Sequence, residues 1–193
     1  MPPAGNKRSG PRRATQKHLQ NAAEHYLARF ATSTENLRRV LMRKVWRSAQ
    51  VHETDADKGA AHVEEIIARC RDLGYLDDQA YADMRVRGLR GRGVSARMIR
   101  QRLKEKGIEA ETADAAVTRF DDEDGGHEPD FQAAVRLARR RRLGPFDMTG
   151  TREERREKQL AALARAGFGY DVARRVIEAP SAEELLAEAG LDD

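Results

Sequence analysis

Apolar residues recur at three- and four-residue spacing through most of the chain, a period typical of amphipathic helices. The first such stretch begins near His18 and runs to Phe30. The segment ATST then interrupts the pattern, and Thr32 or Ser33 is suited to accept free backbone amides at the start of a second helix. This second helix carries the only tryptophan, Trp46, which we expect in the core because amphipathic segments flank it.

A third apolar face begins at Val63 and continues through Cys70 to Leu73, with all three residues expected to point inward. Gly74 directly follows, and glycine accepts the left-handed conformation that a helix end requires. Asp77 is placed to cap the next helix, because its carboxylate accepts hydrogen bonds from the first backbone amides. We therefore interpret Cys70 as a core residue and Asp77 as a structural cap.

The chain contains an internal repeat. The segments IRQRLKEKGI (99–108) and QLAALARAGF (159–168) share the pattern Leu-x-x-x-Gly-apolar. This pattern predicts a Schellman stop, in which glycine ends the helix and the next apolar residue folds back on the leucine. A weaker copy, LRRVLMRKVW, has Val45 in place of the glycine, so we expect that helix to end differently.

Each copy of the repeat is preceded by another helix, at roughly 18–30, 78–90 and 130–142, and is followed by a further amphipathic segment. The sequence thus predicts an all-α protein, an elongated, curved array of tandem three-helix repeat modules. The expected divisions are a disordered basic tail (1–17), a first module (18–76), a second module (77–120), an acidic linker (121–130), a third module with an inserted loop at 144–157 (131–178) and an acidic C-terminal segment (179–193).

The distribution of charge indicates the kind of partner. Charged residues are 35% of the 193 and aromatic residues only 5%, so the core is small for the length. Residues 85–106 carry nine Lys or Arg against one acid, and RLARRRR (136–142) forms a second basic cluster. A solvated helical face explains either run alone, whereas two such runs favour a polyanionic partner.

The residue types that support catalysis are sparse. The five histidines are scattered, without the spacing of metal ligands, and no Walker-type glycine loop is present. We therefore expect no enzyme activity, no metal and no cofactor. No apolar run approaches the roughly 20 residues of a membrane span, and a single cysteine suits a reducing compartment. We expect a cytoplasmic protein that does not enter a membrane, and a monomer, because no segment resembles a coiled-coil seam.

Five segments occur in a characteristic order: STENLRRVL (33–41), EEIIARCRDLGYLDD (64–78), GYLDDQAYA (74–82), RGRGVSARMIRQRLKEKGI (90–108) and RAGFGYDVARRVI (165–177). Together they resemble the RecX family of recombination regulators, over roughly residues 20–178. The chain departs from the family pattern at Val45, where the glycine is missing.

The resemblance implies a regulatory protein without catalytic activity that binds the RecA recombinase, mostly as its filament on single-stranded DNA. Family members lie in the helical groove of the filament, block its extension or promote its disassembly, and so reduce ATP hydrolysis and strand exchange during recombinational DNA repair. A curved, basic, helical body independently fits a groove lined by acidic protein and phosphate.

The residues expected to contact the filament or DNA are the arginines and one lysine of the two basic clusters, because arginine recognises carboxylate and phosphate in bidentate fashion. They are Arg85, Arg87, Arg90, Arg92, Arg97, Arg100, Arg102, Lys104, Arg139, Arg140, Arg141 and Arg142. The three glycines of RGLRGRG (87–93) predict a flexible loop that lets these side chains adapt.

A second hypothesis is a direct, largely sequence-independent DNA-binding protein with helix-turn-helix-like units. The segment 91–107 resembles a recognition helix, although Gln101 is its only neutral base-reading side chain. No aromatic residue lies between Tyr81 and Phe120 to stack on bases. Weak, non-specific DNA affinity is expected under either hypothesis. The acidic linker 121–130 is expected to be solvated, or to restrain the basic second module until a partner binds.

Overall fold

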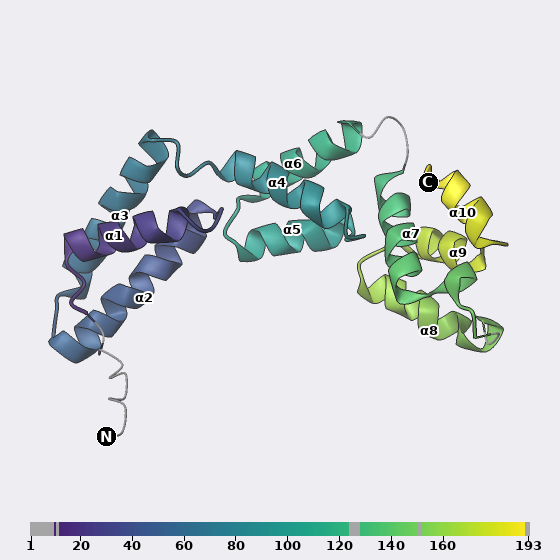
Figure 1. Ribbon diagram of the computed structural model, residues 1–193, viewed down its shortest axis with the longest axis horizontal. Coiled ribbons are helices and arrows are strands. Elements are labelled where there is room, and N and C mark those ends of the chain that lie inside the picture. Colours follow the sequence, from purple (N-terminus) through teal and green to yellow (C-terminus); the bar gives the residue numbers. More distant parts are fainter. Residues whose placement is uncertain (1–9, 11, 124–127, 150–151, 192–193) are drawn as a thin grey trace, which may run out of the picture. The chain divides into compact units, whose positions relative to one another are not determined.

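The protein is helical throughout the part of the chain that the structure describes. In this computed structural model, the described residues are residue 10 and residues 12–123, 128–149 and 152–191. Within these ranges the chain forms α-helices α1 to α10, one short 3-10 helix and no strand, which confirms the all-α prediction. The chain divides into two compact units, residues 1–78 and 79–193, and Figure 1 shows the helices along the chain. Most of the tail predicted for residues 1–17 lies outside the described residues.

The first unit is a three-helix module. Its helices are α1 (Gln16–Leu27), α2 (Thr34–His52) and α3 (Ala56–Asp72). Their apolar faces enclose one core, in which Leu19, Leu41 and Val63 are completely buried. Cys70 packs in the same core, as its place on the apolar face predicted. The core follows from the three- and four-residue spacing of apolar residues, which aligns them along one side of each helix.

Helix α2 begins and ends as its sequence indicates. The Ser33 hydroxyl accepts a hydrogen bond from the Asn36 amide at 3.2 Å and caps the helix. The helix continues past Val45 to His52, and Glu53 closes it in the left-handed conformation with φ of 52°. The first copy of the repeat therefore does end its helix differently from the others.

Two inward assignments in this unit are wrong. Leu73 is 56% exposed and Trp46 is 55% exposed. Helix α3 ends at Asp72, so Leu73 lies past the last residue to which helical periodicity applies. Trp46 follows the buried Val45 directly and points to the outside of α2, because neighbouring positions on a helix lie about 100° apart.

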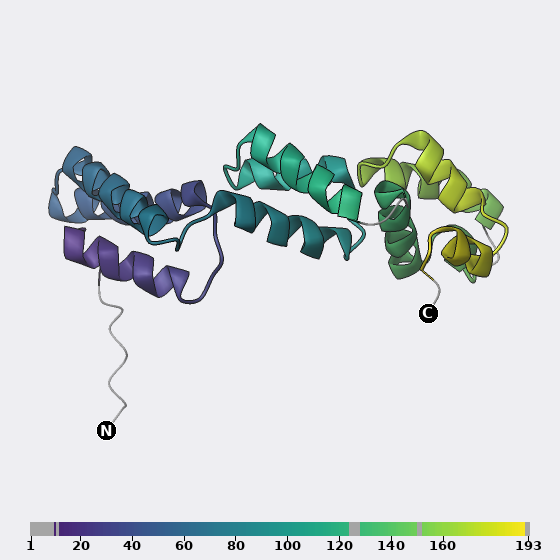
Figure 2. The same cartoon turned by 90° about the horizontal axis from the view of Figure 1, so that it is seen from above.

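The second unit holds two further modules with separate apolar cores. The second module comprises α4 (Asp78–Arg90), α5 (Ala96–Glu105) and α6 (Ala110–Glu123); the third comprises α7 (Pro129–Arg141), the 3-10 helix η1 (Gly144–Phe146), α8 (Arg152–Arg165), α9 (Tyr170–Glu178) and α10 (Ala182–Glu188). Figures 1 and 2 show α4–α6 as one group of helices and α7–α10 as another. Because the cores are separate, other contacts must join the two modules.

Both predicted glycine stops are confirmed in the second unit. Gly107 has φ of 76°, and the Ile108 amide donates a 3.1 Å hydrogen bond to the carbonyl of Leu103. Gly167 repeats this geometry with φ of 89°, and the corresponding bond from the residue that follows it measures 3.2 Å. Each stop turns the chain sharply and places an apolar residue back in the core of its module.

Segment boundaries in the second unit differ from those expected. Helix α6 extends to Glu123 and α7 begins at Pro129, so part of the expected acidic linker is helical, and residues 124–127 lie outside the described residues. The inserted loop is shorter than expected, because α8 begins at Arg152. Ser181 caps α10 by accepting a hydrogen bond from the Glu184 amide, and the completely buried Leu185 joins the core of the third module.

Candidate functional site

The basic residues of α4 occupy three different environments. Arg85 is half-buried. Arg87 is exposed and forms an ion pair of 3.3 Å with Glu123 on α6. Arg90, at the end of the helix, has only 1% of its surface exposed. The sequence predicted the same contact with a partner for all three arginines. Because their exposure differs, they cannot all make that contact.

Arg90 is held by two acidic residues from beyond its own helix. One guanidinium nitrogen, Nη2, donates to both carboxylate oxygens of Asp121, at 2.8 and 2.9 Å. The other, Nη1, donates to Oδ1 of Asp130. Asp121 belongs to α6 in the second module and Asp130 to α7 in the third, so one buried cation joins the two modules. We call these three residues the Arg90 clamp.

The prediction that Arg90 contacts a partner is wrong, because the clamp encloses its guanidinium. A buried charge is tolerated only when it is paired and hydrogen-bonded. Burial raises the pKa of Asp121, and this effect exceeds the opposing influence of the Arg90 charge. The position also carries a signal in the sequence, since Arg90 lies four residues after the buried Val86 and eight after the buried Ala82, on the apolar face of α4.

The clamp extends to the start of α5. Asp130 Oδ1 also accepts a 2.8 Å hydrogen bond from the amide of Ala96, the first residue of that helix. A carboxylate at a helix N-terminus satisfies a free amide and favours the positive end of the helix dipole. Ser95 caps α5 by accepting from the Met98 amide, and its hydroxyl donates at 2.8 Å to the carbonyl of Ala166 in the third module.

The loop between α4 and α5 packs against α7 at Gly93. Gly93 is buried, and it has φ of 70°. A Cβ atom at this position would lie 2.6 Å from the carbonyl oxygen of Ala133 and 2.7 Å from the amide nitrogen of Leu137, both on α7. Glycine is needed here because any side chain would collide with the α7 backbone. The loop is therefore seated directly on the third module.

Helix α5 presents most of its basic residues to solvent. Its apolar side, with Ile99 and Leu103, is buried in the core of the second module. Arg97 and Lys104 share the opposite side at seven-residue spacing, and Arg102 is also exposed. None of these three forms an ion pair with a carboxylate among the described residues. Arg100 differs, because its Nε lies 2.5 Å from a carboxylate oxygen of Asp114 on α6.

The basic run at the end of α7 is exposed, as a contact surface requires. This run consists of Arg139, Arg140, Arg141 and Arg142. Arg142 closes the helix in the left-handed conformation, with φ of 55°. Arg140 Nη1 donates a 2.8 Å hydrogen bond to the backbone carbonyl of Arg92 in the α4–α5 loop. Arg140 and Arg141 share a helix face with Leu137, the residue that contacts the loop glycine.

The structure thus brings together basic residues from both clusters. Arg92 meets Arg140 through the hydrogen bond described above, and Arg141 lies on the same face of α7. Arg97 lies beside the turn between α8 and α9. If Gly167 in that turn carried a Cβ atom, this atom would lie 3.6 Å from the Cβ of Arg97. All of these side chains are exposed, and they define what we call the junction surface: Arg92, Arg97, Arg140 and Arg141.

Three residues that fix this arrangement were missed in the sequence. Asp130 was expected in a solvated linker and Gly93 in a flexible loop, and Ser95 was not singled out. Each is instead a contact between the second and third modules. The available signal was weak, because helix caps and turn glycines recur in every helical protein and do not reveal what packs against them.

Other kinds of site receive no support from the geometry. No cluster of three or more His, Cys, Asp or Glu side chains suited to a metal ion occurs within the described ranges. Burial raises the pKa of the Cys70 thiol, which opposes formation of a reactive thiolate. In the part of the chain that is described, no helix has the length and apolar character needed to cross a membrane.

Comparison with known proteins identifies the family of this chain. A family model for the second three-helix domain of RecX matches residues 77–117, which contain the Arg90 end of α4 and all of α5. The regulatory protein RecX of Myxococcus xanthus is 44% identical over 170 residues, covering 87% of this chain and 88% of that protein. The regulatory protein RecX of Agrobacterium fabrum is 32% identical over 178 residues, covering 89% of each.

The fold is also similar to that of a solved protein. The crystal structure of RecX from Lactobacillus salivarius aligns with a TM-score of 0.57 and 23% identity, over 88% of this chain and 96% of that one. This likeness supports the helical architecture, whereas the family itself is shown by sequence identity that runs through nearly the whole chain. The chain belongs to the RecX family of regulatory proteins.

Proposed function

We propose that this protein binds the RecA recombinase filament on single-stranded DNA and reduces its ATP hydrolysis and strand exchange, thereby modulating recombinational DNA repair. The observation that carries the proposal is membership of the RecX family through 44% identity over 87% of the chain. The protein acts by binding and has no reaction of its own to catalyse.

The exposed basic residues supply a physical basis for this binding. Arg92, Arg97, Arg140 and Arg141 are solvent-exposed arginines, and no carboxylate among the described residues pairs with any of them. Exposed guanidinium groups form charge-assisted, bidentate hydrogen bonds with carboxylates and phosphates. A filament of protein on DNA offers both groups, so the attraction is strong at low salt and weakens as salt screens it.

The test is DNA-dependent ATP hydrolysis by the recombinase on single-stranded DNA, with this protein added at substoichiometric amounts. Affinity for the naked DNA is measured at the same salt. Strong inhibition far below the concentration that coats the DNA supports filament modulation. The variant Arg141→Glu should inhibit less, while Arg43→Glu, the same charge change at an exposed position of α2, measures the effect of charge alone.

A second candidate function is direct, sequence-independent DNA binding. It is favoured by a specific observation, namely that none of the exposed large hydrophobic residues lies in residues 91–105 or 139–142. Protein–protein interfaces usually have an apolar centre, whereas phosphate binding requires only cations. Inhibition that appears only when the DNA is saturated would replace the first proposal with this one.

A further inference from the structure

The two basic clusters are separated by more than thirty residues of sequence, yet the structure holds them as neighbours. The α4–α5 loop lies on α7 through Gly93, and Arg140 donates to the Arg92 carbonyl at 2.8 Å. The Ser95 hydroxyl adds a 2.8 Å bond to Ala166 at the end of α8. All of these contacts are short and directional, and they lie between two modules whose apolar cores are separate.

The Arg90 side chain bonds to carboxylates from both modules at this junction. It is completely enclosed, and its partners come from α6 and from α7. Through Asp130 it is also connected to the first amide of α5. Because a buried cation without its carboxylates is strongly unfavourable, the modules can separate here only if Arg90 loses a partner.

The chemistry of the junction surface favours a phosphate backbone over an acidic protein. Its exposed groups are arginines and glycine backbone. Gly91 is exposed, and a Cβ built there would meet only the carbonyl oxygen of Arg87, at 3.6 Å. Further cations continue along α5 to Lys104, about 10 Å from Arg97 at 1.5 Å per residue. A row of cations without an apolar centre suits a linear polyanion, because phosphate contacts need no buried hydrophobic anchor.

We infer that the junction surface is a single binding site for the sugar–phosphate backbone of one nucleic-acid strand, assembled across two modules and positioned by the Arg90 clamp. Arg90 is a positioning residue, since its guanidinium is buried and touches no ligand. This inference rests on the proposed function and deepens it, by naming the chemical group that this surface recognises and the residues that assemble it.

The clamp makes an unusual prediction about its own acids. Removing a negative charge from a protein that binds a polyanion normally strengthens binding, because the repulsion decreases. Asp130→Asn keeps an Oδ1 acceptor for Arg90 and Ala96 but leaves the buried Arg90 cation with one carboxylate instead of two, which weakens the link between the modules. If positioning dominates, Asp130→Asn binds nucleic acid more weakly, which is the opposite of the electrostatic expectation and of the expectation that this acidic segment restrains the basic module.

The experiment uses the full chain and a fluorescein-labelled 30-nucleotide oligo(dT), with anisotropy measured across a series of salt concentrations. The matched control is Glu123→Gln, which makes the same charge change in the same unit and frees the exposed Arg87. We expect Asp130→Asn to bind roughly tenfold more weakly, because two linked binding surfaces become independent. The slope of its salt dependence should also fall, by about 0.7 for each phosphate that the protein no longer neutralises.

Glu123→Gln should bind as tightly as the wild type or more tightly, with an unchanged or larger salt slope. Asp130→Asn binding as tightly as the wild type, or more tightly, would overturn the inference. Far-UV circular dichroism verifies that each variant is folded. Should Asp130→Asn fail to fold, Asp121→Asn provides the same test, because it also leaves Arg90 with one carboxylate and keeps the hydrogen bond to Ala96.

Oligonucleotide binding is measured without the recombinase. The experiment can therefore contradict the composite binding site without contradicting the proposed inhibition of the recombinase, and the reverse. Weaker oligonucleotide binding by Asp130→Asn, together with a wild-type protein that does not inhibit the recombinase, would retain the composite site and remove the proposed function. Normal oligonucleotide binding by this variant together with strong inhibition would retain the proposed function and assign the filament interaction to another surface.

Discussion

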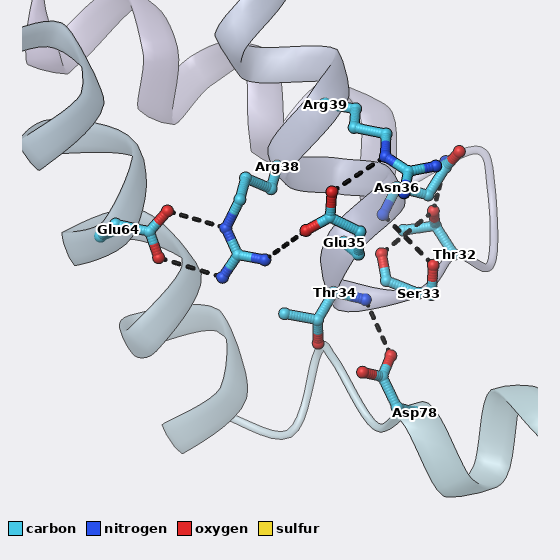
Figure 3. Close-up of polar contacts among 9 residues, drawn as sticks. All are labelled: Thr32, Ser33, Thr34, Glu35, Asn36, Arg38, Arg39, Glu64 and Asp78. Atoms are coloured by element: carbon cyan, nitrogen blue, oxygen red, sulfur yellow. Dashed lines mark hydrogen bonds and ion pairs between the residues drawn. The ribbon is translucent and has the colours of Figure 1, made fainter. Parts of the chain in front are cut away.

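Arg38 in the first unit and Arg90 in the second each hold two carboxylates, and the two arginines differ in burial. Arg38 in α2 bonds Glu35 at 2.6 Å and Glu64 at 2.7 Å, with a third of its side chain exposed. Figure 3 shows this arrangement, with Glu35 on the same helix and Glu64 on a neighbouring one. Arg90 has the same number of partners and is 1% exposed. An arginine paired with two carboxylates is therefore a surface ion pair in the first unit and a buried contact between two modules in the second.

The difference teaches that burial decides the role of an arginine. An exposed pair contributes little, since water and salt screen it. A buried pair contributes little net stability over an apolar packing, but breaking it leaves uncompensated charge and is costly. Arg38 can thus be replaced without consequence for the fold, whereas Arg90 fixes which basic residues become neighbours.

The largest difference should follow from removing each guanidinium. We expect Arg90→Met to lower the free energy of unfolding of the second unit by about 3 kcal/mol, because two carboxylates lose their partner. Arg38→Met should lower that of the first unit by at most about 1 kcal/mol. Urea denaturation separates the units, because the only tryptophan, Trp46, reports on the first unit and circular dichroism reports on all helices.

Arg90→Met should therefore shift the transition seen by circular dichroism and leave the Trp46 fluorescence transition unchanged. Equal, small effects of the two substitutions would contradict the contrast between the buried and exposed arginines.

Two glycines with nearly the same backbone conformation sharpen the comparison. Gly93 at the junction and Gly74 in the first unit have φ of 70° and 72°. A Cβ on Gly74 meets nothing within 4 Å, whereas one on Gly93 lies 2.6 Å from a carbonyl oxygen of α7. Both alanine variants incur about 1–2 kcal/mol of left-handed strain, and Gly93→Ala should lose a further 1–3 kcal/mol, roughly, through overpacking.

Thermal unfolding of Gly74→Ala and Gly93→Ala measures this difference directly. Similar losses of stability in the two variants would show that the α4–α5 loop can move away from α7.

Two helix caps offer a smaller contrast. Thr15 caps α1 in the first unit and is exposed, accepting from the His18 amide at 3.2 Å. Ser95 caps α5 and also donates to the carbonyl of Ala166. Thr15→Ala should cost about 1 kcal/mol, the usual value of a cap. Ser95→Ala should cost about 2 kcal/mol, because that carbonyl loses its partner as well. Chemical denaturation of both variants tests the comparison, and equal costs would contradict it.

The smallest effect concerns the protonation of one acid beside each arginine, Glu35 beside Arg38 and Asp121 beside Arg90. The hydrogen bond from Arg38 lowers the pKa of Glu35 from its ordinary 4.5, while burial raises the pKa of Asp121 from its ordinary 3.8. A carboxyl group whose pKa is lowered by folding stabilises the protein at a pH above its ordinary pKa. This stabilisation is lost as the pH falls through the pKa of the folded state. A carboxyl group whose pKa is raised by folding stabilises the protein at a pH below its ordinary pKa. This stabilisation is lost as the pH rises through the pKa of the folded state.

Carboxyl carbon shifts, followed by nuclear magnetic resonance during an acid titration, should place the pKa of Glu35 below 4.5 and that of Asp121 above 3.8. Asp121 titrating below its ordinary value would mean that the charge of Arg90 outweighs burial.

The sequence by itself determined the helical class, the two glycine stops and many of the core residues, although not Trp46 or Leu73. Apolar periodicity locates residues such as Leu41 and Val63, and the glycines at 107 and 167 end their helices as predicted. These features depend on local geometry, since a helix has 3.6 residues per turn whatever lies around it. The family resemblance also rested on the sequence, and identity over nearly the whole chain confirmed it.

Only the tertiary structure decided which arginines are exposed. Arg90 and Arg92 stand two residues apart in one basic run, yet one is enclosed by acids from two helices and the other faces solvent. The exposure of a charge depends on what another module places against it, and Asp130 is forty residues away from Arg90. Local patterns carry no information about such a partner, because the attraction that matters acts through space and is strengthened by burial.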